Sequence, residues 1–434
     1  MSSDWRTVRL SEVASEVTVG FVGTMANEYV DSGIPFLRSL NVGRLKIDTY
    51  DIRYISHDFH SRISKSRLRP GDVVIVRTGK PGTCAVIPEE LPDSNCSDLV
   101  IVRCGAEILN RFLCYYVNSA ASNHIAAHTV GAVQQHFNVA SAKTMEIPLP
   151  PLGEQKAIAH ILGTLDDKIE LNRKTNETLE AMAKALFKSW FVDFDPVRAK
   201  AEGRPTGLPA EVSDLFPDSF EDSELGEIPS GWEPRTIREW GRTECGKTPS
   251  TNNQEFYGND YMFVTIPDLH NGFHIISSGK QLSELGADSQ RKKLLPSGSV
   301  MVSCIATPGL VGVAKEACFT NQQINSIIPN KMEASWFLAL AMIENRDLLL
   351  SLGGGGSVFF NLSKGRFDEI EILAPSEDLI SAFSGVVSDL MDRCFATKQE
   401  IIALTNIRDA LLPKLISGEI RIPNAEKMLE EVGI

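Results

Sequence analysis

The chain has 434 residues, an apolar fraction of 43%, a charged fraction of 23% and a formal net charge of −13. This length exceeds what one hydrophobic core usually supports, so we expect two or more domains of ordinary globular composition. No run approaches the roughly 18 apolar residues of a membrane span, and residues 1–10 lack the apolar segment of a signal peptide. We therefore expect a cytoplasmic protein.

The cysteines and histidines give no support for a metal site. None of the eight cysteines forms a C-x-x-C pair, which argues against a zinc site and a disulfide framework and favours buried thiols. His124 and His128 are spaced i, i+4, as are His270 and His274, but neither pair has a third ligand nearby. We predict no bound metal in this chain.

The negative charge is unevenly distributed along the sequence. Residues 211–230 contain seven acids and no base, whereas residues 36–80 contain ten Lys or Arg against four Asp. A strongly acidic chain is not typical of nucleic-acid binding, but an acidic segment elsewhere can mask one basic face. Two interpretations stay open here, a basic binding face and an ordinary solvated surface.

Residues 1–150 have the pattern of a mixed α/β domain. Short β-rich runs at residues 34–40, 72–77 and 99–103 are separated by Pro-Gly turns. A helical segment around residues 109–127 and a strand at 145–149 complete the expected domain.

Residues 151–194 are expected to form one long helix. It begins after Pro150-Pro151, with Glu154 in its first turn, and must end before Pro196. Apolar residues recur at steps of three and four, which is typical of a coiled-coil seam, and buried Asn residues in such a seam fix its register. About forty residues at roughly 1.5 Å each predict a rod about 60 Å long. The predicted seam residues are Ile158, Leu162, Leu165, Ile169, Asn172, Asn176, Leu179 and Leu186.

The second half of the chain repeats the first after a linker. Residues 195–230 are rich in Pro, Gly and acids, and predict an extended linker. Residues 231–375 pass through the same sequence of strand and turn patterns as residues 1–150, at offsets of 223 to 227. An offset of 225 carries the first seam onto a second one without a gap, which indicates an internal repeat. The second seam comprises Phe383, Val387, Leu390, Ile401, Leu404 and Leu411.

The second long helix is expected over residues 376–418, followed by a loosely held tail over residues 419–434. Pro413 should kink or end this helix, and Gly418 suits the position after its last turn. The predicted fold class is thus mixed α/β: two globular domains separated by two long antiparallel helices, with a pseudo-two-fold internal repeat.

One motif suggests a nucleotide-binding enzyme. The segment from Gly241 to Thr248 matches the phosphate-loop pattern G-x-x-x-x-G-K-[ST]. However, Pro249 and turn-forming residues follow where a helix should begin, so a loop that presents Lys247 and Thr248 to a backbone phosphate is the better interpretation. We find no spacing typical of catalytic residues, and predict that the chain is not itself an enzyme.

The sequences around the two long helices resemble those of a known family. Pro150-Pro151-Leu152-Gly153-Glu154-Gln155 opens the first long helix, and Leu411-Leu412-Pro413-Lys414-Leu415-Ile416 lies near the end of the second. With two variable domains, each followed by a long helix, the chain resembles the specificity subunit of type I restriction-modification enzymes over nearly its whole length. The opening of the second helix, Pro375-Ser376-Glu377-Asp378, departs from the pattern because it lacks the Gln.

The resemblance implies a DNA-reading role within a larger complex. Each domain would read one half of a bipartite double-stranded DNA target, and the helices would set the spacer and dock two methylation subunits. Restriction motor-nuclease subunits would join this core. S-adenosylmethionine, ATP and Mg would be bound by those partners, with no cofactor in this chain and no membrane partner.

We predict DNA contacts at basic residues of both domains and at one threonine of the second. In the first domain they are Arg38, Arg44, Lys46, Arg62, Lys65, Arg67, Arg69, Arg77 and Lys80. In the second domain they are Lys247, Thr248, Lys280, Arg291, Lys292 and Lys293. The alternatives that stay open are a nucleotide-binding enzyme built on the Gly241 to Thr248 loop, and a coiled-coil adaptor unconnected with DNA.

Overall fold

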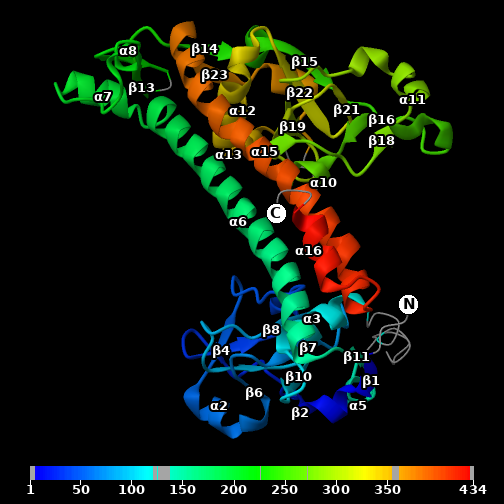
Figure 1. Ribbon diagram of the computed structural model, residues 1–434. Coiled ribbons are helices and arrows are strands. Elements are labelled where there is room, and N and C mark those ends of the chain that lie inside the picture. Colours follow the sequence, from blue (N-terminus) through cyan, green and yellow to red (C-terminus); the bar gives the residue numbers. More distant parts are fainter. Residues whose placement is uncertain are drawn as a thin grey trace. The chain divides into compact units, whose positions relative to one another are not determined.

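The computed structural model describes residues 5–120, 125, 137–224, 226–270, 272–353 and 361–430 (Figure 1). The chain divides into two compact units, Met1–Glu170 with Ile402–Ile434, and Leu171–Ile401. Each unit holds one α/β body and a part of both long helices, so the fold is mixed α/β as predicted. Within the described ranges, every helix is too short or too polar to span a membrane.

The body of the first unit is built from two sheets and a two-stranded ribbon. The ribbon pairs β1 (Arg6–Arg9) with β11 (Glu146–Leu149). A four-stranded sheet has the order β2 (Ala14–Val19), β10 (Leu99–Cys104), β7 (Val73–Val76) and β8 (Cys84–Val86). A five-stranded sheet has the order β3 (Tyr29–Val30), β5 (Arg53–Ile55), β4 (Ile34–Leu37), β9 (Ser94–Cys96) and β6 (Arg67–Leu68). The helices of this body are α1 (Leu10–Val13), α2 (His57–Arg62), α3 (Asn110–Ser119) and α5 (Val139–Lys143).

The body of the second unit repeats this plan. Its ribbon pairs β14 (Glu233–Thr236) with β23 (Glu371–Ala374). Its main sheet has the order β15 (Gly241–Cys245), β22 (Ile324–Pro329), β19 (Val300–Ser303), β20 (Val311–Ala314) and β17 (His274–Ile275). A smaller sheet has the order β18 (Gln281–Leu282), β16 (Tyr257–Val264) and β21 (Cys318–Thr320). The helices of this body are α9 (Ile237–Trp240), α10 (Ile266–Leu269), α11 (Glu284–Asp288), α12 (Ser335–Glu344), α13 (Arg346–Gly353) and α14 (Lys364–Asp368).

The internal repeat is visible in the order of the strands. The order β2-β10-β7-β8 in the first unit corresponds to β15-β22-β19-β20 in the second. Helix α3 packs against β7 and β8, and α12 packs against β19 and β20 in the same way. All four residues of β7 are buried, as are all four of β19, because each strand is apolar apart from Ser303 and has a neighbour on both sides.

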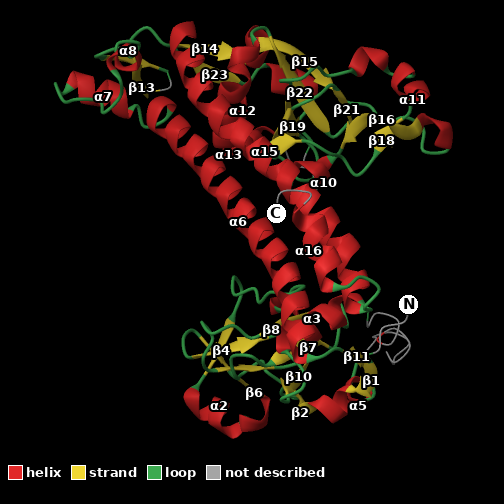
Figure 2. Cartoon of the chain, in the orientation of Figure 1, coloured by secondary structure: helices red, strands yellow, loops and turns green. Residues whose placement is uncertain are grey.

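The two long helices are α6 (Leu152–Phe191) and α15 (Glu377–Ile416), each 40 residues long (Figure 2). They run antiparallel, because residues that come later in α6 contact residues that come earlier in α15. Asp166 pairs with Arg408 at 2.8 Å in the first unit. In the second unit, Asn172 donates a hydrogen bond to Glu400 at 2.9 Å, and Cys394 lies 3.9 Å from the Asn176 carbonyl oxygen.

Most of the predicted seam residues are buried. Leu162, Leu165, Phe383 and Val387 are fully enclosed, and Leu404 is 1% exposed. Leu186 and Leu390 are only partly buried, because near the second body the helices turn other side chains inward, and Ile401 is also only partly buried. There Phe187, Trp190 and Phe191 each pack on Phe383, with ring centroids 5.9, 5.6 and 4.9 Å apart. Met391 is buried next to Leu390.

The two seam asparagines are buried and hydrogen-bonded. Asn172 is 4% exposed and Asn176 is 6% exposed. Asn172 donates to the Glu400 carboxylate, and the Asn176 side-chain oxygen accepts from the Thr397 hydroxyl. A buried amide loses its water, so it is tolerated only where the opposite helix supplies a partner. These pairs therefore bind the two helices in one register.

The prediction of an extended linker at residues 195–230 is wrong. This segment forms α7 (Asp195–Ala201), α8 (Ala210–Ser213) and an antiparallel hairpin of β12 (Phe220–Ser223) and β13 (Gly226–Pro229). Its few apolar residues anchor it: Val197, Phe216 and Ile228 are buried, and Phe216 lies 5.1 Å from Trp190. The acids stay on the outside, so their repulsion does not extend the chain.

The C-terminal region also differs from the prediction. Helix α15 continues through Pro413 to Ile416, because a proline in the last turn removes only one helical hydrogen bond. Gly418 ends this segment with a positive φ of 74°. The expected loose tail contains a further helix, α16 (Ile422–Glu430), whose Ala425 is buried.

The Asp166–Arg408 pair provides a test of the helix packing. Its side chains are only 22% and 14% exposed, and the Tyr115 hydroxyl donates to the same carboxylate at 2.7 Å. Arg408→Ala should lower the free energy of unfolding by about 2–4 kcal/mol, because it leaves a half-buried carboxylate without its cation. A double-mutant cycle with Asp166→Asn in urea unfolding should give a coupling of about 1–3 kcal/mol. Lys414→Ala, at an exposed position of α15, is the control, and equal effects of Arg408→Ala and Lys414→Ala would contradict the prediction.

His274 is a buried titratable group at the edge of the second body. Its ring is 5% exposed and stacks on Trp336 at 4.8 Å and Phe395 at 6.0 Å. Neither ring nitrogen has a hydrogen-bond partner among the described residues. Burial lowers the pKa of His274 to about 4, with Lys398 and Lys315 adding to this effect and Asp392 opposing it.

A lowered histidine pKa makes stability depend on pH. Above about pH 6.5, protonation of His274 should not affect the free energy of unfolding. As the pH falls to 4, it should lower the free energy of unfolding by about 3 kcal/mol, because the unfolded chain binds the proton more readily. The urea midpoint of wild type should fall more steeply over this range than that of His274→Phe. His270→Gln, at an exposed site, should keep the wild-type slope, and parallel curves for wild type and His274→Phe would contradict the assignment.

Candidate functional site

Three of the predicted basic residues of the first domain gather around one turn. This turn, residues 97–98 between β9 and β10, is called the first-domain tip. The Asp98 carboxylate accepts hydrogen bonds from the hydroxyls of Ser39, at 2.9 Å, and Thr78. Arg77 lies 3.9 Å from the same carboxylate and donates to the Phe137 carbonyl oxygen at 3.3 Å. Asp98 has a φ of 56°, so the turn adopts a conformation that its hydrogen bonds must stabilise.

The loops beside the first-domain tip carry the other two members of this group, Arg38 and Lys80, and a further turn carries Arg44 and Lys46. Arg38 is next to Ser39 and pairs with Asp51 at 3.0 Å. Lys80 follows Arg77 in the turn that connects β7 to β8. Arg44 and Lys46 are exposed on a turn whose Leu45 amide donates to the Cys84 carbonyl oxygen at 2.9 Å, at the start of β8.

The remaining predicted DNA-contact residues of this domain lie on other elements. Arg62, Lys65, Arg67 and Arg69 are all exposed along α2, the turn after it, and β6. Arg62 lies 3.2 Å from Asp58 and Arg67 lies 2.8 Å from Asp93, so acids within the domain balance part of this charge. The basic residues between 36 and 80 therefore form two groups and not one continuous face.

In the second domain, Lys247 and Thr248 lie on the loop that follows β15. The Gly246 amide donates to the Ile324 carbonyl oxygen at 3.1 Å, and the Lys247 amide donates to the Thr320 carbonyl oxygen at 3.0 Å. A Cβ at Gly246 would lie 2.2 Å from the Asn321 oxygen and 2.3 Å from the Thr320 hydroxyl. Only glycine permits this close approach, which holds Lys247 and Thr248 against the neighbouring hairpin.

The hairpin turn that this loop touches was not predicted as part of the site. It comprises residues 321–323 between β21 and β22 and is called the second-domain tip. The Thr248 hydroxyl donates to the Gln322 side-chain oxygen, and Gln322 is exposed. A run of three amide residues, Asn-Gln-Gln, between two β-rich segments is the sequence signal that could have indicated this turn.

The other basic residues of the second domain are divided between two places. Lys293 pairs with Glu244 at the end of β15, close to the Lys247 loop. Arg291 instead bonds to Asp288, the Tyr261 hydroxyl and Glu284, and these hydrogen bonds raise its pKa. Lys280 and Lys292 are exposed outside this cluster.

The geometry of residues 241–248 does not match a phosphate loop. Gly241–Cys245 is strand β15, paired with β22, where a phosphate loop would curve around its ligand. Thr248 is followed by Pro249 and a turn where the helix N-terminus should lie. Burial also raises the pKa of the Cys245 thiol, although Lys293 opposes this, so that thiol is not an activated nucleophile. The nucleotide-binding alternative is therefore unsupported.

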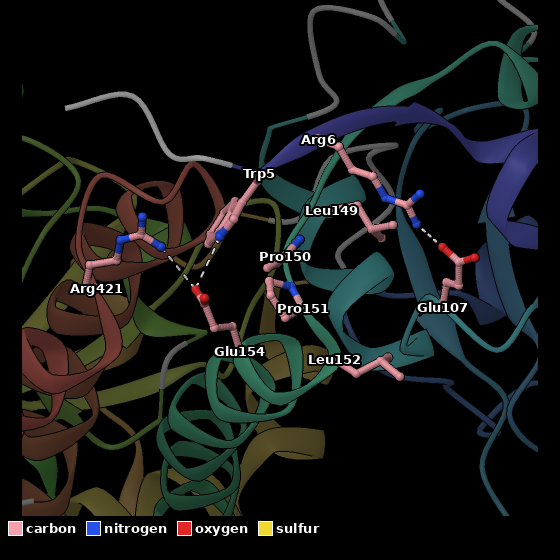
Figure 3. A pocket seen from close by; sticks show the side chains of 9 residues that line it. All are labelled: Trp5, Arg6, Glu107, Leu149, Pro150, Pro151, Leu152, Glu154 and Arg421. Atoms are coloured by element: carbon pink, nitrogen blue, oxygen red, sulfur yellow. Dashed lines mark hydrogen bonds and ion pairs between the residues drawn. The ribbon is translucent and has the colours of Figure 1, made fainter.

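A cavity of about 640 Å³ lies at the start of α6 (Figure 3). The Glu154 carboxylate accepts a hydrogen bond from the Trp5 ring nitrogen and pairs with Arg421, each at 3.3 Å. Arg6 pairs with Glu107 across the same cavity. Each charged side chain that lines the cavity thus has an opposite charge beside it. These pairs connect residues near the two ends of the chain, and they leave no free acid or base for catalysis.

The structure gives no indication of a metal centre in the part of the chain that it describes. No group of three or more His, Cys, Asp or Glu residues there could hold an ion. His270 is exposed and His274 is buried, so this pair does not share one face. His124 and His128 lie outside the described residues. So do residues 121–124 and 126–127 of the expected helix.

Comparison with known proteins identifies a family. A family model described as "Type I restriction modification DNA specificity domain" matches residues 2–181 and 229–382. The HindI specificity subunit of Haemophilus influenzae is 39% identical over 323 residues, which cover 64% of this chain and 70% of that protein. The MjaIX specificity subunit of Methanocaldococcus jannaschii is 24% identical over 432 residues, or 96% of this chain and 94% of that protein.

A solved structure has the same fold. The S subunit of a type I restriction-modification system from M. genitalium superposes with a TM-score of 0.59 at 16% sequence identity. The match covers 95% of this chain and 96% of the S subunit.

Gly246 offers a test of the loop–hairpin contact. Gly246→Ala should lower the free energy of unfolding by about 1–3 kcal/mol, because the new methyl group forces the loop away from the second-domain tip. Gly365→Ala is a matched control, since Gly365 lies in α14 and a Cβ added there would meet no atom within 4 Å, and it should be neutral or slightly stabilising. Thermal unfolding of both variants checks the prediction, and equal stability of the two would contradict it.

Proposed function

Because this chain belongs to the type I restriction-modification DNA specificity family, we propose that its two domains each read one half of a bipartite double-stranded DNA target. Members of this family recognise DNA, and the relatives are named specificity subunits, which are not catalytic. The observation that carries the proposal is the duplicated α/β body, repeated with one strand order and one long helix after each copy.

The domain organisation that we propose follows the repeat. Residues 1–150 and 231–375 are the two target-recognition domains, and residues 151–194 and 376–418 are the spacer helices. Two readers with the same architecture and different loop residues can bind two different half-sites, and the separation of those half-sites then follows from the protein. Antiparallel α6 and α15, fixed in one register by their buried polar pairs, would determine that separation.

The DNA contacts that we propose are the predicted basic residues near the two tips. Arg38, Arg77 and Lys80 lie around the first-domain tip, and Lys247 lies beside the second, next to Thr248, whose hydroxyl donates to Gln322. Lysine and arginine contacts to phosphates supply most of the non-specific affinity and position the protein on the duplex. The net charge of −13 is compatible with this role when partner subunits contribute further positive charge.

The partners of the chain would supply the chemistry. We propose that methylation subunits, two in number, dock on α6 and α15 and the adjoining domains, and that motor-nuclease subunits join this core. S-adenosylmethionine, ATP and Mg would be bound by these partners. Since its target is the genome, the complex would act in the cytoplasm.

Methylome sequencing of the host with the assembled complex tests the proposal. Replacing residues 1–150 with the corresponding domain of a relative should change one half of the methylated motif and leave the other half intact. Deleting seven residues from each long helix in register should shorten the spacer and preserve both halves, because two turns of seam are removed without rotating the packed faces. An unmodified complex that methylates no split motif, or a swap that alters both halves, would refute the two-reader arrangement.

A further inference from the structure

The second-domain tip presents one oriented side-chain amide to solvent. Gln322 is exposed, and its Oε1 accepts a hydrogen bond from the Thr248 hydroxyl. Among the described residues, no other group bonds to the Gln322 Nε2 atom. The carboxamide therefore keeps two donor hydrogens and one acceptor lone pair available, in an orientation that Thr248 restricts.

The backbone beneath Gln322 is held from both sides. The Asn321 side chain accepts a hydrogen bond from the Gln323 amide at 3.1 Å and donates to the Gln323 side-chain oxygen at 3.0 Å. Asn321 is only 9% exposed, so this pair forms part of the turn itself. On the other side, the Gly246 loop packs directly on the turn. Gln322 thus projects from a fixed support, and little conformational entropy would be lost when it binds a ligand.

The surroundings of Gln322 suit a nucleic acid. Lys247 is exposed and immediately precedes Thr248 on the loop that orients the amide. A cation beside an amide provides one group for a backbone phosphate and one for a base edge.

The corresponding turn of the first domain carries different chemistry. There Asp98 takes the place of Gln322, and Gly20, like Gly246, packs closely on the hairpin, with a Cβ at Gly20 2.8 Å from the Cys96 sulfur. The Asp98 carboxylate is already bonded to Ser39 and Thr78. The same structural position therefore holds loops together in one domain and presents an exposed amide in the other.

We propose that Gln322, oriented by Thr248, reads an adenine in the half-site bound by the second domain. Adenine presents the N7 acceptor and the N6 amino donor in the major groove, and a glutamine amide matches both with its Nε2 donor and its Oε1 acceptor. Guanine presents two acceptors at these positions and cannot pair with both groups of the amide. This inference rests on the proposed function and names a specificity-determining residue for it.

The test uses the complete complex with its methylation subunits. Wild type, Gln322→Ala and Thr248→Val are compared by methylome sequencing and by binding to duplexes with each base pair at every position of the second half-site. Gln322→Ala should reduce the preference for adenine at one position on the order of 10- to 100-fold. Thr248→Val should relax the same position less, since it frees the amide without removing it. Asn424→Ala, an exposed amide on α16, should leave the motif unchanged.

The outcomes separate this inference from the function itself. If wild type methylates a split motif and Gln322→Ala retains every base preference, or weakens binding equally to all sequences, the inference is wrong and the two-reader function stands. If the unmodified complex has no split motif, the proposed function fails. If Gln322→Ala lowers the thermal stability of the complex, its effect on the motif no longer tests the inference, and Thr248→Val becomes the test. An unchanged base preference in Thr248→Val would then overturn the inference.

Discussion

The packing of α6 against α15 is the constraint on which the rest of the molecule depends. Neither helix could be stable alone over 40 residues, because each has an apolar stripe that needs a partner. The apolar stripe provides most of the free energy of helix packing, and the polar pairs within it determine the register of the two helices. Asp166–Arg408 acts in the first unit, and Asn172–Glu400 and Asn176–Thr397 act in the second. A helix shifted by one turn would leave these buried groups without partners, which makes alternative registers costly.

The same packing explains why the sequence predicted the helices well. A seam of apolar residues at steps of three and four is a local pattern, so it can be recognised without knowledge of the fold. The pattern failed near the second body, where Phe187 and Met391 are buried and Leu186 and Leu390 are partly exposed, and at Ile401, which is also only partly buried. There the large aromatic rings of α6 pack onto Phe383 and Phe337, and this tertiary packing overrides the heptad.

The linker and the site were harder to predict, for different reasons. Composition alone suggested an extended segment at residues 195–230, but its buried apolar residues, among them Val197, Phe216 and Ile228, outweigh the repulsion of many exposed acids. Charge alone selected the basic residues of the first domain, but it could not divide them between the first-domain tip and the α2–β6 stretch. The pairing of Thr248 with Gln322 joins residues 74 positions apart, and no local pattern reports such a contact.

The two tips show how an exposed side chain can vary in this architecture while the fold that supports it stays the same. Each hairpin is anchored by backbone hydrogen bonds and by a closely packed glycine. Asp98 at the first-domain tip also bonds to Ser39 and Thr78, whereas Gln322 at the second-domain tip is exposed and contributes little to the buried core. Substitutions at such a position drift with small effects on folding, so a lineage can sample new chemistries there while its scaffold stays intact. Diversification of one copy also leaves the other unaltered, which lets each half of the gene evolve on its own.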